Sequence, residues 1–253
     1  MDTPLLTEIK NSINPNNEDD SLNPLIDQCY SFLQSNINEY PSNEHKTYLN
    51  EVLRFYTFEK KDVSSSFTRW QKWAAYRSKY HPESITEKDI PIQIKTGKAF
   101  IHGHDKEGRP CVVIKQSLHI PGETDMEEMI RYGFYIMEKA LNEAAKVNKK
   151  DIVLLMDRID FGWSNVDKRM ITNRGINGII QDYYAEKVYR VYIYPINWLF
   201  QTLMQMAGPF LSKETIEKMV YLNKEEELKQ FFTDENLLKE LGGTSEYKIN
   251  SQY

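Results

Sequence analysis

The stretch IVLLMD, residues 152–157, is a continuous apolar run that ends in an acid. A strand that is apolar on both faces is typical of the covered centre of a parallel sheet. A second β-rich run, VYRVYIY, occupies residues 188–194. We expect a long helix over about 125–147, before the first run, and another over about 165–184, between the two. This order predicts right-handed crossovers and an α/β domain with a mostly parallel sheet.

The first third of the chain has a different pattern of apolar residues, which predicts helices. Apolar residues recur at spacings of three and four over residues 22–33, and similar patterns predict helices over 44–56 and 62–80. We therefore expect a small all-helical module over residues 21–89. Residues 1–20 are polar and rich in Asn and Asp, and we expect them to be poorly ordered.

The sheet domain is expected over residues 90–250. It opens with KAFIHGHDKEGRPCVVIK, residues 98–115, which predicts two strands around a turn at residues 105–108. The net charge of −5 gives no global attraction to nucleic acid, so we expect no nucleic-acid partner. The two cysteines, Cys29 and Cys111, provide no disulfide framework and fit a reducing compartment. Since the first residues also lack the pattern of a signal peptide, we expect a cytoplasmic protein.

The longest uncharged run covers residues 191–212, in a chain with 27% charged residues. Proline, glycine and polar residues divide this run into a strand, a helix and a turn, each too short to cross a bilayer. Its helical part, residues 198–206, is apolar on nearly every face. Such a helix is either buried in a core or alternates between two apolar environments, as a gate over a lipid-sized cavity would.

The helix that follows starts at Ser212, a favourable N-cap residue. Its Thr215 and Lys218 are three residues apart and share one face. A hydroxyl beside an ammonium group suits a phosphate, although a solvated helix face explains the same spacing.

Motifs for catalysis or metal binding are weak. The sequence contains no nucleophile elbow, P-loop, dinucleotide fingerprint or zinc-protease motif. His102 and His104 flank a turn without an accompanying Cys/His cluster, and Asp157, Asp160 and Asp167 are more typical of caps and turns than of acid–base pairs. We therefore predict no catalytic residue, no metal site and no cofactor.

Five blocks in order resemble the CRAL-TRIO lipid-binding domain family, and the likeness extends over about residues 25–245. The blocks are GKAFIHGHDKEGRPCVVIK, IVLLMDRIDFGWSN, YYAEKVYRVYIYPINWLF, GPFLSKETIEKMVYL and ENLLKELGGT. YLNEVLRFYTFEKKDV, with the Trp-rich segment after it, resembles the helical module that precedes this domain. The resemblance implies a mostly parallel sheet that floors a hydrophobic pocket, covered by helices and preceded by a small all-helical module.

The same resemblance implies a function and a site. Family members carry one hydrophobic ligand, such as a phosphoinositide, another phospholipid, a sterol or an isoprenoid-type lipid, under a mobile helical gate, and they are not catalysts. In the phosphatidylinositol-transfer branch a Glu, a Thr and a Lys contact the inositol phosphate, and they correspond here to Glu186, Thr215 and Lys218. The expected gate is 197–222. The expected pocket and gate residues are Ile114, Leu154, Met156, Trp198, Phe200, Leu203, Met204 and Phe210.

Some positions depart from that branch. Thr57 and Glu59 stand where the branch has arginines, one of which contacts phosphate. Apolar Ile152 and Leu154 replace the hydroxyl residues that meet a choline head group, which argues against phosphatidylcholine because its head group would lack hydrogen-bond partners.

Three functions remain as hypotheses. The first is a monomeric cytoplasmic lipid-transfer protein that associates transiently with membranes. The second is a lipid-sensing module that acts on a protein partner through its helical front end, residues 22–80. The third is an enzyme that acts on lipids or small acids. The sequence supports it least, because it shows no nucleophile–base pair.

Overall fold

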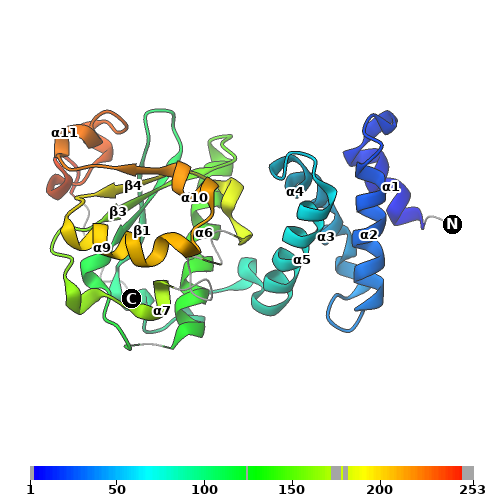
Figure 1. The fold of residues 1–253 in the computed structure, drawn as a ribbon, viewed down its shortest axis with the longest axis horizontal. Coiled ribbons are helices and arrows are strands. Elements are labelled where there is room, and N and C mark those ends of the chain that lie inside the picture. The colour runs from blue at the N-terminus through cyan, green and yellow to red at the C-terminus, as the bar shows by residue number, and fades with distance from the viewer. Residues whose placement is uncertain (1–2, 124, 172–177, 179–181, 247–253) are drawn as a thin grey trace. The chain divides into compact units, whose positions relative to one another are not determined.

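The computed structural model describes residues 3–123, 125–171, 178 and 182–246 (Figure 1). The chain divides into two compact units, Met1–His81 and Pro82–Tyr253. The first unit consists of α1 (Pro4–Ile13), α2 (Leu22–Ser35), α3 (His45–Asn50), α4 (Val52–Phe58) and α5 (Val63–Tyr80). The expected helix over 44–56 is therefore two short helices that meet at Glu51.

The N-terminus corrects the sequence-based expectation of poor order. Helix α1 begins with Pro4 after the N-cap Thr3, whose hydroxyl accepts a hydrogen bond from the backbone N–H of Leu6. Leu6 and Ile9 are buried. Two apolar residues on one helix face are enough to anchor this segment, although its overall composition is polar.

Aromatic side chains fill the core of the helical unit. The indole N–H of Trp70 donates to the backbone oxygen of Tyr48 over 2.9 Å, so the buried polar atom of the ring is satisfied. The rings of Phe32 and Trp70 meet edge to face, with centroids 5.8 Å apart. Helix α5 begins at its predicted N-cap, Asp62, whose carboxylate accepts from the N–H of Ser65.

The second unit is built on five strands in the order β1-β2-β3-β4-β5. Strands β1 (Ala99–His104) and β2 (Pro110–Lys115) are antiparallel, and all other neighbours are parallel. The remaining strands are β3 (Ile152–Asp157), β4 (Val188–Tyr194) and β5 (Met219–Tyr221). The predicted α/β class with a mostly parallel sheet is therefore confirmed.

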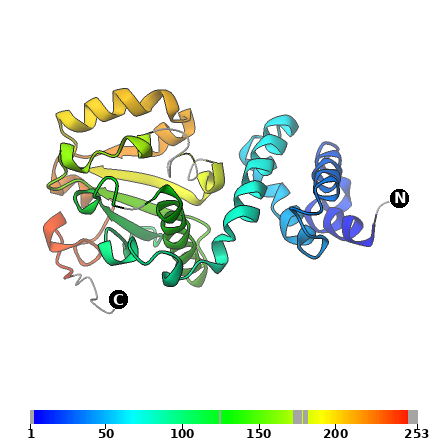
Figure 2. The same cartoon turned by 90° about the horizontal axis from the view of Figure 1, so that it is seen from below.

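Helices follow the strands of this unit, and several lie against the sheet (Figures 1 and 2). They are α6 (Met126–Lys146), α7 (Lys168–Ile171), α9 (Trp198–Ala207), α10 (Lys213–Lys218) and α11 (Glu225–Leu228). The unit also contains short 3-10 turns, among them η6 (Gln116–Leu118), η8 (Ala185–Lys187), η9 (Gly208–Phe210), η10 (Asp234–Asn236) and η11 (Lys239–Leu241). Much of the helix expected over 165–184 lies outside the described residues.

The end of α10 differs from the helical pattern read from the sequence. The helix ends at Lys218, and the next three residues form β5, in which Met219 pairs with Val191 and Val220 with Tyr192. Pairing with β4 outweighs the local helical periodicity, because the apolar side chains of Met219 and Val220 gain contacts on both faces of the sheet.

The uncharged run over 191–212 is divided as its sequence predicts. It contains the end of β4, helix α9 and the turn η9, and the Asn197 carboxamide caps α9 by accepting from the N–H of Phe200. Within the described residues, no helix is long and apolar enough to span a bilayer.

Candidate functional site: an apolar cavity with a polar end

A cavity of about 300 Å³ lies on one face of the sheet. The strand residues that border it alternate with residues that face the other way, as the twofold repeat of a strand requires. Helix α6 borders the cavity on one side, and α9 with the residues that follow it borders another. The main apolar residues of the lining are Val112, Ile114, Leu154, Met156, Val191, Ile193 and Met219 from the strands, Ile136 and Met137 from α6, and Phe200, Leu203, Met204, Ala207 and Leu211 from the cover.

The structure brings most of the expected pocket residues together. Ile114, Leu154 and Met156 border the cavity from the sheet, and Phe200, Leu203 and Met204 border it from α9. The alternation along each strand and the helical repeat of α9 explain why these positions converge.

Two of the expected pocket and gate residues are not placed in the lining. The side chain of Trp198 is 64% exposed and does not border the cavity, because it lies at the first position of α9, next to Trp163 with ring centroids 5.9 Å apart. The placement of Trp198 in the pocket is therefore wrong, although the residue belongs to the cover. The side chain of Phe210 lies outside what the structure describes.

Of the three expected head-group residues, only one borders the cavity. Thr215 borders the cavity, whereas Glu186 and Lys218 are not among its lining residues. The Thr215 hydroxyl lies 2.9 Å from that of Ser212, which also caps α10 as its sequence predicts. Glu186 lies just before β4 and Lys218 just before β5, so both are near the edge of the sheet where these strands begin.

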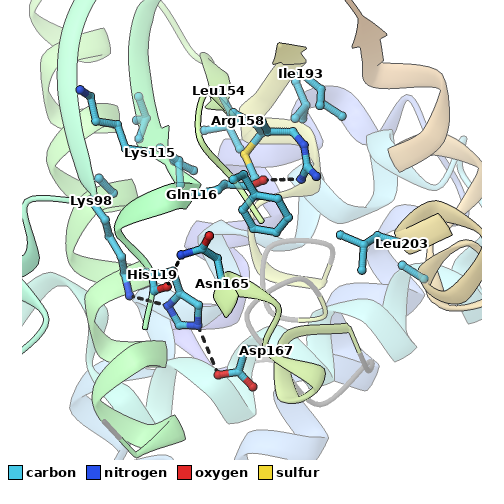
Figure 3. Close-up of a pocket in the computed structure, with 18 of the residues that line it drawn as sticks. Lys98, Lys115, Gln116, His119, Leu154, Arg158, Asn165, Asp167, Ile193 and Leu203 are labelled. Atoms are coloured by element: carbon cyan, nitrogen blue, oxygen red, sulfur yellow. Dashed lines mark hydrogen bonds and ion pairs between the residues drawn. The ribbon is translucent and has the colours of Figure 1, made fainter. Parts of the chain in front are cut away.

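The opposite end of the cavity is polar, as Figure 3 shows. The Lys98 ammonium donates to Nδ1 of His119 over 3.2 Å, and Nε2 of His119 lies 3.3 Å from the Asp167 carboxylate. Since Nδ1 accepts, the proton of a neutral His119 ring is on Nε2 and points to Asp167. Arg169 forms an ion pair with the same carboxylate at 2.6 Å.

Burial and hydrogen bonding together set the ionisation of this cluster. Burial lowers the pKa of Lys98 to about 8, because the ammonium loses its water shell. Burial, and then the neighbouring Lys98, also lower the pKa of His119, so the ring is held neutral. The hydrogen bond from Arg169 lowers the pKa of Asp167 to about 2, which keeps this carboxylate charged.

Arg158 is the second buried cation at this end of the cavity. Its side chain is 5% exposed, and burial lowers its pKa to about 10. Leu154, Met156 and Arg158 are spaced by two residues and all border the cavity. The twofold repeat of the predicted strand over 152–157 reaches Arg158 when it is extended by one residue, so the sequence contains a signal for this placement.

Asp157 faces away from the cavity and has a local role. Its carboxylate accepts a hydrogen bond from the N–H of Ile159 over 3.0 Å, which is the pattern of a turn acid. Burial raises the pKa of this carboxyl group.

Comparison with known proteins identifies the family. A family model described as the CRAL/TRIO domain matches residues 94–243, more than half of the chain, so the chain belongs to the CRAL/TRIO domain family. Members of this family are lipid-binding and lipid-transfer proteins and are generally not enzymes.

Individual relatives are distant. A CRAL-TRIO domain-containing protein of Schizosaccharomyces pombe is 26% identical over 210 residues, which cover 78% of this chain and 46% of that protein. The phosphatidylinositol transfer protein CSR1 of Eremothecium gossypii is 25% identical over 222 residues, 79% of this chain and 48% of that protein. The chain thus spans about half the length of these curated relatives.

A solved structure supports the fold. The crystal structure of Sfh5 superposes with a TM-score of 0.62 and 14% identity, and it covers 93% of this chain and 91% of that one. At this level of identity the likeness shows a shared architecture, and the ligand has to be argued from the cavity.

Proposed function

We propose that this protein binds one lipid molecule in the cavity and exchanges it with membranes. The observation that carries the proposal is an apolar cavity between a sheet face and α9, a helix that is apolar on nearly all sides. Burial of an acyl chain there contributes about 25 cal/mol per Å² of apolar surface kept out of water, so a lipid that leaves a bilayer for the cavity does not have to expose its chain to water.

Helix α9, the turn η9 and α10 form the gate of this proposal. Leu203 and Met204 face the cavity, whereas Trp198 and Met206 on the same helix are 64% and 45% exposed. A gate with apolar residues on both sides is suited to contact a bilayer while the ligand moves. Pro195 and the Gly208-Pro209 pair are the proposed hinges, since they lie at the ends of the moving helix.

The test of lipid carriage uses a matched pair of substitutions in α9. Met204→Trp adds bulk inside the cavity, and Met206→Trp adds the same bulk on the exposed side. Native mass spectrometry after incubation with mixed liposomes should show a bound lipid in the wild type and in Met206→Trp. Met204→Trp should bind at most about a tenth as much. If no lipid is bound by any of them, lipid carriage is rejected.

Exchange between vesicles separates a carrier from a sensor. A carrier accelerates movement of a fluorescent lipid from donor to acceptor vesicles, while a sensor binds the lipid without accelerating this movement. Acceleration by the wild type, lost in Met204→Trp, is the expected result for the proposed carrier. Bound lipid without acceleration would favour the sensor, which acts through a protein partner.

We further propose that a phosphoinositide head group is read by Glu186, Thr215 and Lys218 at the edge where β4 and β5 begin. Thr215 borders the cavity, and Lys218 ends the short helix that Thr215 belongs to. Lys218→Ala should reduce binding of phosphatidylinositol phosphate vesicles about tenfold while leaving uptake of neutral lipid unchanged. Lys213→Ala removes a 90% exposed ammonium from the same helix and is the control. Equal phosphoinositide affinity in both variants would reject the head-group role.

A further inference from the structure

Arg158 occupies a position where the strand pattern predicts an apolar residue. It follows Leu154 and Met156 at a spacing of two and borders the same cavity. Its side chain is nonetheless a cation and only 5% of it is exposed. A buried guanidinium in an apolar wall needs compensation from a carboxylate or from several hydrogen bonds.

The protein itself provides little of this compensation. Nη1 of Arg158 donates to the side-chain oxygen of Gln116 over 2.5 Å, an interaction drawn as a dashed line in Figure 3. Nε and Nη2 are buried and have no hydrogen-bond partner within the described part of the chain. The guanidinium carbon lies 4.2 Å from the ring centre of Phe161 and 5.1 Å from that of Phe200. Cation–π contacts and one neutral amide stabilise the charge only in part.

A second buried arginine shows how this chain treats such a charge elsewhere. Arg109 is 9% exposed and pairs with three carboxylates, Asp105 at 3.0 Å, Glu107 at 2.8 Å and Asp151 at 2.9 Å. Each of its three nitrogens therefore has an anionic acceptor. Arg158 is at least as buried, and its described surroundings offer none, which points to a counter-ion from outside the chain.

The two unsatisfied nitrogens define the shape of that counter-ion. Nε and Nη2 lie on the same edge of the planar guanidinium, so their N–H bonds run parallel into one acceptor with two oxygens. Carboxylates and phosphates match this fork. We infer that the lipid carried in the cavity is an anionic amphiphile, whose carboxylate or phosphate pairs with the Nε–Nη2 edge of Arg158 when this side chain, which borders the cavity, turns that edge toward the ligand. This inference rests on the proposal that the cavity holds a lipid.

The remaining charges at this end of the cavity are compatible with an incoming anion. The Lys98 ammonium contacts the neutral ring of His119, and the Asp167 carboxylate is already paired with Arg169. Lys115 forms an ion pair with Glu240. Since Arg158 follows the carboxyl end of β3, it lies toward the opposite edge from Glu186 and Lys218. The anion site at Arg158 is therefore an alternative to the phosphoinositide site at that edge, and variants at the two edges distinguish the two.

The volume of the cavity favours a single-chain ligand. About 300 Å³ is at the lower end of the range found for pockets that enclose small-molecule ligands. A fatty acid supplies a carboxylate on one chain, and a lysophospholipid such as lysophosphatidic acid supplies a phosphate on one chain. Both provide the acceptor with two oxygens that Arg158 needs. Comparing each with a neutral analogue of the same chain shows which of the two the site prefers.

The experiment measures binding of a fluorescent C18 polyene fatty acid and of its methyl ester to the full chain. The wild type should bind the acid on the order of tenfold more tightly than the ester, because charge-assisted hydrogen bonds are lost in the ester. Arg158→Met keeps the length and apolar stem of the side chain and should abolish this preference while leaving the affinity for the ester within about twofold. Arg190→Met, on the face of β4 that does not border the cavity, should retain the preference.

A parallel arm uses lysophosphatidic acid and a monoacylglycerol of the same chain as competitors. A preference for the phosphate in this arm, lost in Arg158→Met, with no preference for the fatty acid over its ester, would assign the site to a phosphate. The reverse result would assign it to a carboxylate. Arg158→Lys retains the charge but lacks the two-nitrogen edge, and it should lose most of the preference in the favoured arm.

A preference for the anion in both arms, lost in Arg158→Met, would show that the site accepts either group. The following outcomes overturn the inference. If the wild type binds acid and ester, and phosphate and neutral lipid, equally well, then lipid carriage stands and the anion site is rejected. An unchanged preference in Arg158→Met rejects the role of this residue. If neither acid nor ester nor any liposome lipid binds, lipid carriage and the anion site fall together. Thermal unfolding of ligand-free Arg158→Met, expected at or above the wild-type Tm, establishes that the variant is folded.

Discussion

The two faces of the sheet are built by alternate residues of the same strands, but one face is packed into a closed core and the other borders a cavity. Val153, Leu155 and Tyr192 belong to a closed core with side chains from the C-terminal segment, such as Phe232 and Leu241. The residues one position along these strands, such as Leu154, border the cavity instead. One face is filled by the chain and the other leaves room for a ligand, so stability and binding are assigned to neighbouring positions.

The largest predicted effect is a difference in the free energy of unfolding between variants of two adjacent leucines, one on each face. Leu155→Ala on the filled face should lower the free energy of unfolding by about 3 kcal/mol, since it removes contacts on every side. Leu154→Ala should cost about 1 kcal/mol in the ligand-free protein, because its side chain already borders an empty volume. Urea unfolding of both variants measures the difference.

The same pair should show the opposite order in lipid binding. Leu154→Ala should weaken lipid binding severalfold, while Leu155→Ala should leave the affinity of the folded fraction unchanged. Equal losses of stability in the two variants would mean that the cavity face is as closely packed in solution as the other, which contradicts the comparison.

The filled and hollow faces differ in how far the sequence predicted them. Periodicity and the apolar run at 152–157 were sufficient to predict the parallel sheet, because the strands depend on local repeats. The expected pocket residues, such as Ile114 and Leu203, followed from the family resemblance, and both border the cavity. The family resemblance supplied the prediction that a pocket lies on the sheet, under covering helices. Trp198 was misplaced because a helix that is apolar all round does not reveal which side faces the ligand.

Long-range pairing accounts for what the sequence could not provide. Strand β5 forms because β4 lies beside it, and its three residues are too few to predict a strand from the sequence alone. The difference between Arg109 and Arg158 is equally invisible in the sequence, since it depends on which carboxylates the fold brings near each guanidinium.

The second prediction concerns the buried charge of Lys98 on the hollow face. Its pKa is lowered to about 8 by burial, an effect that Glu123 and Asp167 partly offset, whereas in the unfolded chain its pKa is near the ordinary value of about 10.4. Between these values the unfolded state binds more protons, so this group makes stability rise with pH. The free energy of unfolding of Lys98→Met should therefore exceed that of the wild type by about 3 kcal/mol at pH 7, and this difference should shrink between pH 8 and pH 10.

Urea unfolding at pH 7, 8, 9 and 9.5 tests this dependence. Leu154→Ala removes no titratable group and should give a curve parallel to that of the wild type. A gap between Lys98→Met and the wild type that stays constant over this range would show that Lys98 keeps its proton in the folded protein, and the hollow face would then tolerate a full charge at this position.

The smallest effect on stability is expected on the outer side of the gate. Trp198→Ala removes a side chain that is 64% exposed, so the free energy of unfolding should change by less than about 0.5 kcal/mol. If this tryptophan meets the bilayer, the variant should bind vesicles several times more weakly in a sedimentation assay, and lipid exchange should slow with it. Ile37→Ala, which removes a 46% exposed apolar side chain from the helical unit, should change neither quantity. An unchanged exchange rate in Trp198→Ala would leave the cavity as a binding site but remove this part of α9 from the path by which the ligand enters. The hollow face would then be filled by a route other than the proposed gate.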